Sequence, residues 1–312
     1  MTRVLGLVFL ILLLLAGAFA LSPAHGESAP EVIRATAPGG QDGDKPSADR
    51  APEKSAEAPP DLAKANLKLR VGENIVYDIR VNGMPAGKAS MDVSKLDTME
   101  PNGGASVWIV SLNIRSNRAY SLFYDVRDRA AAKIDVNGGF SRFAHIDKKD
   151  GDVKDEEFVH FNYDVKTMSA NYERRRFSDN LLRSHAIPLP GNVLDPLSAI
   201  YYLRSLDLSK FKENDVISLP VCTDRRVWNL QLQVVKRGSA DFGDLKNRSY
   251  VEIYADPPFK GLFEKKSRLD VYIDSQTGVP LRMNVEIPIG SAEVEISEHT
   301  KSPFEPPDED EK

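Results

Sequence analysis

Apolar and polar residues alternate along most of the chain between residues 75 and 296. In the first such segment, Tyr77, Ile79 and Val81 would share one face of a strand, with Asp78 and Arg80 on the other. A period of two with one apolar and one polar face is typical of antiparallel strands that meet water on one side. The same alternation recurs further along, at residues 108–114, 159–164, 228–234, 269–273, 281–287 and 292–296.

Turn signals separate these segments. They are Asn82-Gly83, Asn102-Gly103-Gly104, Asn137-Gly138-Gly139, Asp150-Gly151 and Thr277-Gly278. Asn-Gly and Asp-Gly pairs between alternating runs favour tight hairpins, so we predict roughly twelve to fourteen strands. Consecutive hairpins with short turns predict an all-β, mainly antiparallel fold, built as a highly curved sheet or a barrel-like domain.

One segment, residues 195–206, has the pattern of a helix instead. Asp195 is suited to the N-cap and Pro196 to the first helical position. Apolar residues fall on nearly every face, so we expect a buried helix that caps or plugs the curved sheet. Arg204 follows this apolar run, and we expect its guanidinium to reach a carboxylate or backbone carbonyls.

The first 26 residues predict export. Arg3 precedes an uncharged run over residues 4–21, and Ala24-His25-Gly26 fits a small-x-small cleavage site. Ala18-Phe19-Ala20 also fits that rule, and an uncleaved membrane anchor stays open as an alternative. The expected location is therefore the periplasm or cell envelope, either free or tethered to the inner membrane.

Composition divides the remaining chain into three parts. Residues 27–63 are rich in Pro and Ala and predict a disordered tether, because they hold too little apolar surface to offset the entropy of ordering. Residues 301–312 predict an acidic disordered tail. Between them, residues 64–300 form the expected β domain. The formal net charge of −5 gives no electrostatic reason to bind nucleic acid.

A single cysteine, Cys222, limits both redox and anchoring chemistry. It excludes an internal disulfide, and its place far from the N-terminus excludes a bacterial lipoprotein. Its apolar surroundings over residues 217–222 predict a buried, inert thiol rather than a nucleophile.

The sequence contains no recognisable catalytic or metal-binding motif. The histidines lack the close spacing of a metal site; they are His25, His145, His160, His185 and His299. The local signatures of serine hydrolases and phosphate-binding loops are missing. Ligands or carboxylate pairs assembled from distant residues stay open. We therefore assign no catalytic, cofactor-binding or metal-binding residue, and lean against an enzyme.

Two clusters have competing interpretations. Arg174-Arg175-Arg176 could bind an anionic headgroup or polysaccharide, but a solvated strand end or protected sheet edge is the more ordinary explanation. The aromatic run at residues 120–124, together with Tyr201 and Tyr202, could line a ligand cavity, although such residues more often belong to the core.

The order of several motifs resembles a known family. Val71-Gly72-Glu73-Asn74-Ile75-Val76-Tyr77 comes first, then Gly83-Met84-Pro85-Ala86-Gly87, the helix Asp195-Pro196-Leu197-Ser198-Ala199-Ile200-Tyr201-Tyr202-Leu203-Arg204, and finally Leu269-Asp270-Val271-Tyr272-Ile273-Asp274. Over residues 67–298 the chain resembles the exported bacterial proteins grouped as domain of unknown function 3108. The resemblance implies a signal peptide, an envelope location and a mainly antiparallel β fold. It implies no activity and no catalytic residues.

Three functional hypotheses follow. The leading one is a non-catalytic periplasmic binding or envelope-maintenance module, whose curved sheet encloses a lipid, glycan or apolar peptide. The second is an interaction domain whose partner docks on an edge strand or on the tether. The third is an envelope hydrolase, which would need His145 or His160 to meet a carboxylate or a serine in a cleft.

Overall fold

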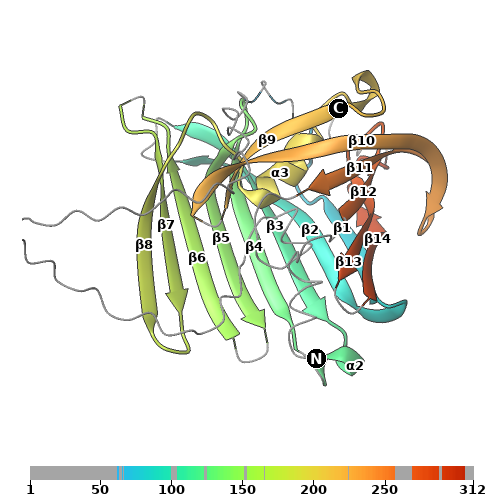
Figure 1. The fold of residues 1–312 in the computed structure, drawn as a ribbon, viewed down its shortest axis with the longest axis horizontal. Coiled ribbons are helices and arrows are strands. Elements are labelled where there is room, and N and C mark those ends of the chain that lie inside the picture. Colours follow the sequence, from blue (N-terminus) through green and yellow to red (C-terminus); the bar gives the residue numbers. More distant parts are fainter. Residues whose placement is uncertain are drawn as a thin grey trace, which may run out of the picture.

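The computed structural model describes residues 62, 65, 67–99, 104–122, 125–150, 153–164, 166–223, 225–256, 269–287 and 290–305. The predicted signal peptide lies outside these residues, as does all of the predicted tether except Leu62. Within them, fourteen antiparallel strands form one continuous, strongly curved sheet (Figure 1). The prediction of an all-β fold with a curved antiparallel sheet is confirmed.

The elements follow one another in this order along the chain. The strands are β1 (Asn74–Val81), β2 (Met84–Met99), β3 (Ala105–Ser116), β4 (Arg127–Asp135), β5 (Ser141–Asp150), β6 (Val153–Asn162), β7 (Ser169–Arg176), β8 (Leu181–Pro188), β9 (Val216–Thr223), β10 (Arg226–Phe242), β11 (Leu245–Asp256), β12 (Leu269–Asp274), β13 (Pro280–Ile287) and β14 (Gly290–Thr300). The helices are α2 (Arg118–Ser121), α3 (Pro196–Leu203) and the short 3-10 helix η1 (Leu208–Lys210). None of the helices in the described residues is long and apolar enough to cross a membrane.

The sheet consists of two runs of sequential hairpins that meet at its middle. Strands β1 to β8 form one run and β9 to β14 the other, and β1 pairs with β14 to join them. The two ends of the sheet are therefore β8 and β9. In Figure 1 the β9–β10 hairpin crosses over the broad layer formed by β4 to β8.

Helix α3 lies inside the curve of the sheet, as the sequence predicts. The Asp195 carboxylate accepts hydrogen bonds from the backbone N–H groups of Leu197 and Ser198 and so caps the helix. Every residue of the helix is buried. A helix that is apolar on all sides finds partners only in such an enclosed place.

The arginine at the end of α3 meets a carboxylate, which confirms the expectation for Arg204. Its Nη1 and Nη2 donate to the two carboxylate oxygens of Glu73 at 2.5 and 2.9 Å. Both side chains are almost fully buried, and Glu73 comes directly before β1. The pair therefore links the end of the helix to the start of the sheet.

Both ends of the domain pack beyond the boundaries expected from sequence. Leu62, from the predicted tether, packs against the main core. Ser302 is buried, and Phe304 packs against the same core although both were assigned to the acidic tail. The remainder of that tail, residues 306–312, lies outside the described residues.

Candidate functional site

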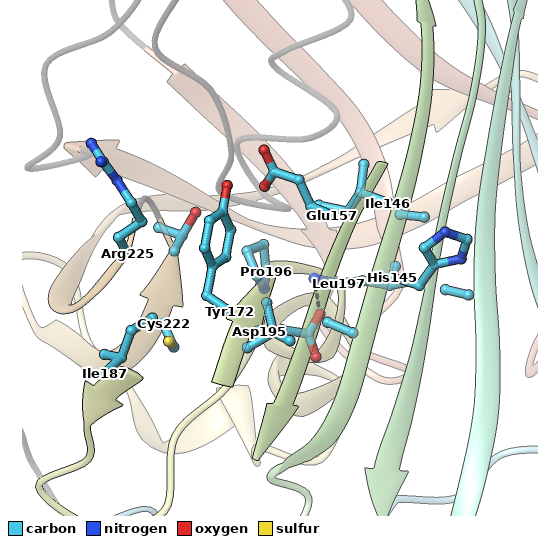
Figure 2. A pocket seen from close by; sticks show the side chains of 15 residues that line it. His145, Ile146, Glu157, Tyr172, Ile187, Asp195, Pro196, Leu197, Cys222 and Arg225 are labelled. Carbon is cyan, nitrogen blue, oxygen red and sulfur yellow. Dashed lines mark hydrogen bonds between the residues drawn. The ribbon is translucent and has the colours of Figure 1, made fainter. Parts of the chain in front are cut away.

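A small cavity lies on the concave side of the sheet, near the start of α3. Its volume is about 30 Å³, enough for only a few water molecules, since each needs roughly 10–15 Å³. Figure 2 shows Cys222, Asp195, Glu157 and Tyr172 around it. The space is too small for a lipid chain or a sugar.

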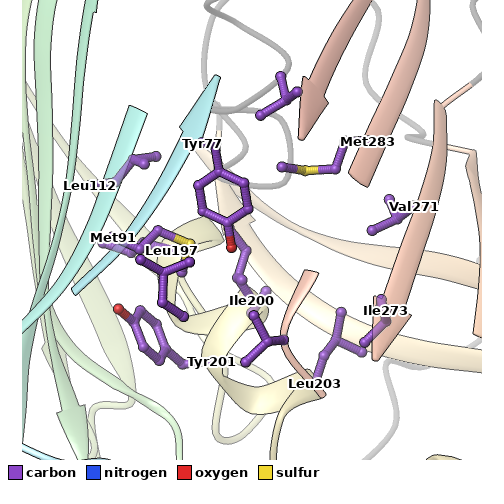
Figure 3. Close-up of a cluster of buried hydrophobic side chains, with 14 of the residues drawn as sticks. Tyr77, Met91, Leu112, Leu197, Ile200, Tyr201, Leu203, Val271, Ile273 and Met283 are labelled. Carbon is purple, nitrogen blue, oxygen red and sulfur yellow. The ribbon is translucent and has the colours of Figure 1, made fainter. Parts of the chain in front are cut away.

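The rest of the concave side is filled by the core. Figure 3 shows Leu197, Ile200 and Leu203 of α3 lying between the first strands of the sheet and β12 and β13. Tyr201, which belongs to the same helix, is fully buried, and Tyr202 nearly so. These two tyrosines are therefore core residues and do not line a ligand cavity. Of the run at residues 120–124, Tyr120 is partly buried and Leu122 is exposed, while residues 123 and 124 lie outside the described residues.

The titratable groups around the small cavity have structural partners or are heavily desolvated. Asp195 caps α3 and also accepts a 2.6 Å hydrogen bond from the Ser141 hydroxyl. Burial raises the pKa of the Cys222 thiol to about 12, so it is not a thiolate at neutral pH. Its burial confirms the prediction from sequence.

Among the titratable groups that line the small cavity, Glu157 differs because the pKa of its carboxyl group lies near neutral pH. Burial raises the pKa of its carboxyl group to about 7, against the opposing effect of the Arg174 guanidinium. The Arg174 Nε atom lies 3.5 Å from Glu157 Oε1, while its Nη2 donates to Asp155 at 2.5 Å. This carboxyl group thus changes charge in the physiological range.

The predicted arginine cluster is engaged within the protein. Arg174 binds Asp155 and Glu157, and Arg176 forms an ion pair with Asp179. These arginines belong to β7, which has β6 on one side and β8 on the other. The three arginines do end a strand, as one of the two ordinary explanations expects. The other explanation, a sheet edge, is wrong, because the next strand, β8, pairs with β7 along its whole length.

A much larger groove lies beside β8. Its volume is about 630 Å³, and it is bounded by β8 on one side and by the turn between β9 and β10 on the other. The lining residues are Tyr172, Leu182, Arg183, Ser184, His185, Arg225 and Arg226. Tyr172 and Arg225 also line the small cavity, so the groove and the cavity adjoin, as the positions of these residues in Figure 2 illustrate.

The groove is basic and has no compensating acid in its described lining. Arg183, Arg225 and Arg226 are all exposed. None of the three forms an ion pair with a carboxylate elsewhere in the described parts of the chain. The Arg226 guanidinium stacks over the ring of Trp228, 3.4 Å from its centroid, which orients it at the groove. In size, the groove falls within the range of about 300–1,000 Å³ that is usual for ligand sites.

The remaining histidines do not form a catalytic arrangement. His145 stacks on Phe158 and His160 packs against Phe143 across β5 and β6. Neither ring hydrogen-bonds a carboxylate or a serine among the described residues. His299 lies in β14, where its Nδ1 contacts Glu305 at 2.8 Å. The described residues contain no group of three His, Cys, Asp or Glu side chains that could hold a metal ion.

Sequence reasoning missed the groove because its walls come from separate segments. The basic residues at 183–185 and 225–226 have no common motif. One local signal was present: two consecutive arginines follow Asp224, between the alternating runs that became β9 and β10. Two adjacent arginines at a hairpin turn can contact an anion, but only the fold shows that they face β8.

Comparisons with known proteins give a family but no activity. The model of the family described as "Protein of unknown function (DUF3108)" matches residues 76–297. Among solved structures, the chain is similar to the crystal structure of a beta-barrel-like protein of domain of unknown function DUF1849 from Brucella abortus. The TM-score is 0.42 and the identity 9%, over 74% of this chain and 98% of that chain. No curated protein matches the chain.

Proposed function

We propose that this chain, which belongs to the DUF3108 family of proteins of unknown function, is a non-catalytic binding module that takes an anionic partner in the groove beside β8. The observation that carries the proposal is the groove itself: about 630 Å³ of open space walled by Arg183, Arg225 and Arg226. Three exposed guanidiniums around one concavity favour carboxylate or phosphate groups, which they bind through paired N–H donors.

The filled interior supports an external site over an enclosed one. Helix α3 occupies the space in which a lipid or glycan would have to lie, and the adjoining cavity of about 30 Å³ is too small for either. The partner therefore binds at the open end of the curved sheet, not within it.

The groups near the groove support binding over catalysis. A general acid or base must lie within hydrogen-bond reach of its substrate, and a nucleophile needs an activating base. His185 lines the groove, but its ring has no carboxylate or serine hydrogen-bond partner among the described residues. In the adjoining cavity, His145 stacks on Phe158 and the high pKa of the Cys222 thiol keeps it protonated. The envelope location of the module rests on the export segment expected over residues 1–26, which N-terminal sequencing of the mature protein would test.

The binding site can be tested with a simple polyanion. The probe is fluorescein-labelled octaglutamate, with octaglutamine as the uncharged reference, and the readout is fluorescence anisotropy against the full mature protein. Removing two groove charges in Arg183→Gln/Arg225→Gln should raise Kd at least fivefold, because an exposed ion pair contributes up to about 1 kcal/mol. The matched control is Arg115→Gln/Arg118→Gln, two exposed arginines away from the groove. Equal loss of binding in both double variants would overturn the proposed site.

A further inference from the structure

We infer that the occupant of the groove is an extended acidic polypeptide segment, which adds to the sheet as a strand along the free edge of β8. This inference rests on the proposed function and names the class of its partner. The backbone N–H and C=O groups of β8 would pair with the added strand, whereas the arginines around the groove would bind its charges.

Strand β8 has an unpaired backbone edge that faces the groove. Within the part of the chain that the structure describes, it is the last strand of the sheet and pairs only with β7. Leu189 N–H donates to Met168 C=O at 3.1 Å, just past the ends of β8 and β7. Because hydrogen-bonded pairs alternate along an antiparallel ladder, Leu182, Ser184 and Ala186 turn their N–H and C=O groups away from β7. No hydrogen bond from another described residue reaches these groups.

The lining of the groove shows that this edge forms part of its wall. Four consecutive residues, 182–185, border the groove. Successive side chains of a strand point to opposite faces of the sheet, so consecutive residues border one space only where that space runs along the strand edge. An occupant there meets alternating donors and acceptors, a pattern that another strand complements.

At the opposite end of the sheet, part of the edge of β9 is paired with another segment of the chain. At β9, Leu194 pairs with Val221 as a parallel bridge; its N–H donates to Pro220 C=O, and its C=O accepts from Cys222 N–H. Along β8, residues 182–186 are all exposed. Long exposed edges favour association with other strands, and natural proteins usually protect them.

The charge arrangement specifies an acidic strand. Arg183 lies directly opposite Arg174 in the β7–β8 register, and like charges at such positions repel one another. Arg174 is held by Asp155 and Glu157, whereas Arg183 has no acidic partner among the described residues. A carboxylate from an added strand would pair with Arg183 on one wall and with Arg225 or Arg226 on the other.

The test separates backbone pairing from charge. The probe is a fluorescein-labelled (Glu-Thr)4 peptide, compared with the same peptide N-methylated at alternate residues, which keeps every charge but removes donors from one edge. Binding to the full mature protein is measured by anisotropy. In parallel, amide hydrogen exchange of the 15N-labelled protein is followed with and without the peptide. We expect N-methylation to weaken binding at least tenfold, and the peptide to protect the amides of Leu182, Ser184 and Ala186.

A protein variant provides the reciprocal test. Ser184→Pro removes one outward N–H from β8 at a position where an edge strand tolerates proline, while Ser184→Ala retains that N–H and serves as its control. We expect at least a fivefold weaker affinity for (Glu-Thr)4 in the proline variant alone. If Ser184→Pro disturbs folding, the N-methylated peptide tests the same contact on the unaltered protein.

The outcomes distinguish the two proposals. Loss of affinity on removing Arg183 and Arg225, with equal binding of the methylated and unmethylated peptides and no amide protection in β8, would overturn strand addition and leave the anionic site standing. Binding that is insensitive to the arginine substitutions would overturn both.

Discussion

Gly139 and Gly278 occupy the same position in two turns of the same shape, and both turns press against the end of α3. Each glycine N–H donates to the C=O of an aspartate four residues earlier, Asp135 or Asp274, at 2.9 Å. Their φ angles are +68° and +69°. A side chain on Gly139 would collide with Ala65 and crowd Tyr202; one on Gly278 would lie 2.5 Å from the Arg204 Cα atom.

Replacing Gly278 with alanine should therefore destabilise the domain strongly. Two costs combine: a positive φ, which costs an L-residue about 1–2 kcal/mol, and a clash with the helix backbone. The control is Gly83→Ala, where φ is +77° but no atom lies within 4 Å of the added Cβ. Urea unfolding should show a loss of about 1 kcal/mol for Gly83→Ala and clearly more for Gly278→Ala. Equal losses of stability in the two variants would mean that the turn at Gly278 does not pack closely against the helix.

The ion pair between Arg204 and Glu73 should also be costly to break. Arg204→Met leaves a buried carboxylate without its partner, which typically costs about 3–5 kcal/mol. Arg80→Met removes an ion pair whose side chains are 44% and 35% exposed, and should cost under about 1 kcal/mol. Both are measured by urea unfolding at neutral pH. The double variant Glu73→Gln/Arg204→Met should be more stable than Arg204→Met, and a double variant that is no better would contradict the role of the unpaired charge.

Glu157 should make stability fall as the pH rises from about 4.5 to about 7. Its native pKa of about 7 lies above the ordinary value of 4.5, so the native state holds the proton more tightly than the unfolded state across this window. The contribution of Glu157 to the free energy of unfolding is complete below pH 4.5. It is lost as the pH rises to about 7, and the total loss is on the order of 3 kcal/mol. Glu157→Gln should flatten this slope. Glu156→Gln, on the opposite face of β6, should leave it in place; stability is measured by urea unfolding at successive pH values.

The thiol of Cys222 should resist alkylation in the folded protein. It is buried, and its pKa of about 12 leaves almost no thiolate at pH 8. Iodoacetamide should add no mass to the native protein and one adduct in concentrated urea. The Leu122→Cys variant, at a side-chain position that is 80% exposed, should gain one adduct under native conditions. Rapid labelling of native Cys222 would show that the region around the small cavity opens readily.

Much of the fold was predictable because the evidence for it is local. The alternation of apolar and polar residues in each strand indicates which face is buried. The buried helix is predicted by its N-cap residue and by apolar residues on nearly all its faces. The outcome for Arg204 followed from the same logic: a guanidinium beside an apolar run needs a partner wherever the fold places it.

Properties that depend on distant pairing were not predictable. Whether Arg174 lies at an edge depends on whether β8 pairs with β7, and the walls of the groove come from segments about forty residues apart. The likeness of the two glycine turns was also missed. The two turns begin with Ile134-Asp135 and Ile273-Asp274. A match of two residues so far apart in the sequence cannot be recognised as a repeat. The similarity of the turns becomes evident only in the fold, where both contact α3.

The pairing of β1 with β14 has a consequence for the order in which the domain assembles. The two runs of hairpins can each form from neighbouring segments, but they join only where the first strand meets the last, as in the Arg80–Glu293 contact across 213 residues of chain. Contacts of such long sequence separation form slowly. A chain still lacking its final strand would leave β1 and β13 as open edges, so completion of the native sheet must wait until residue 300 is available.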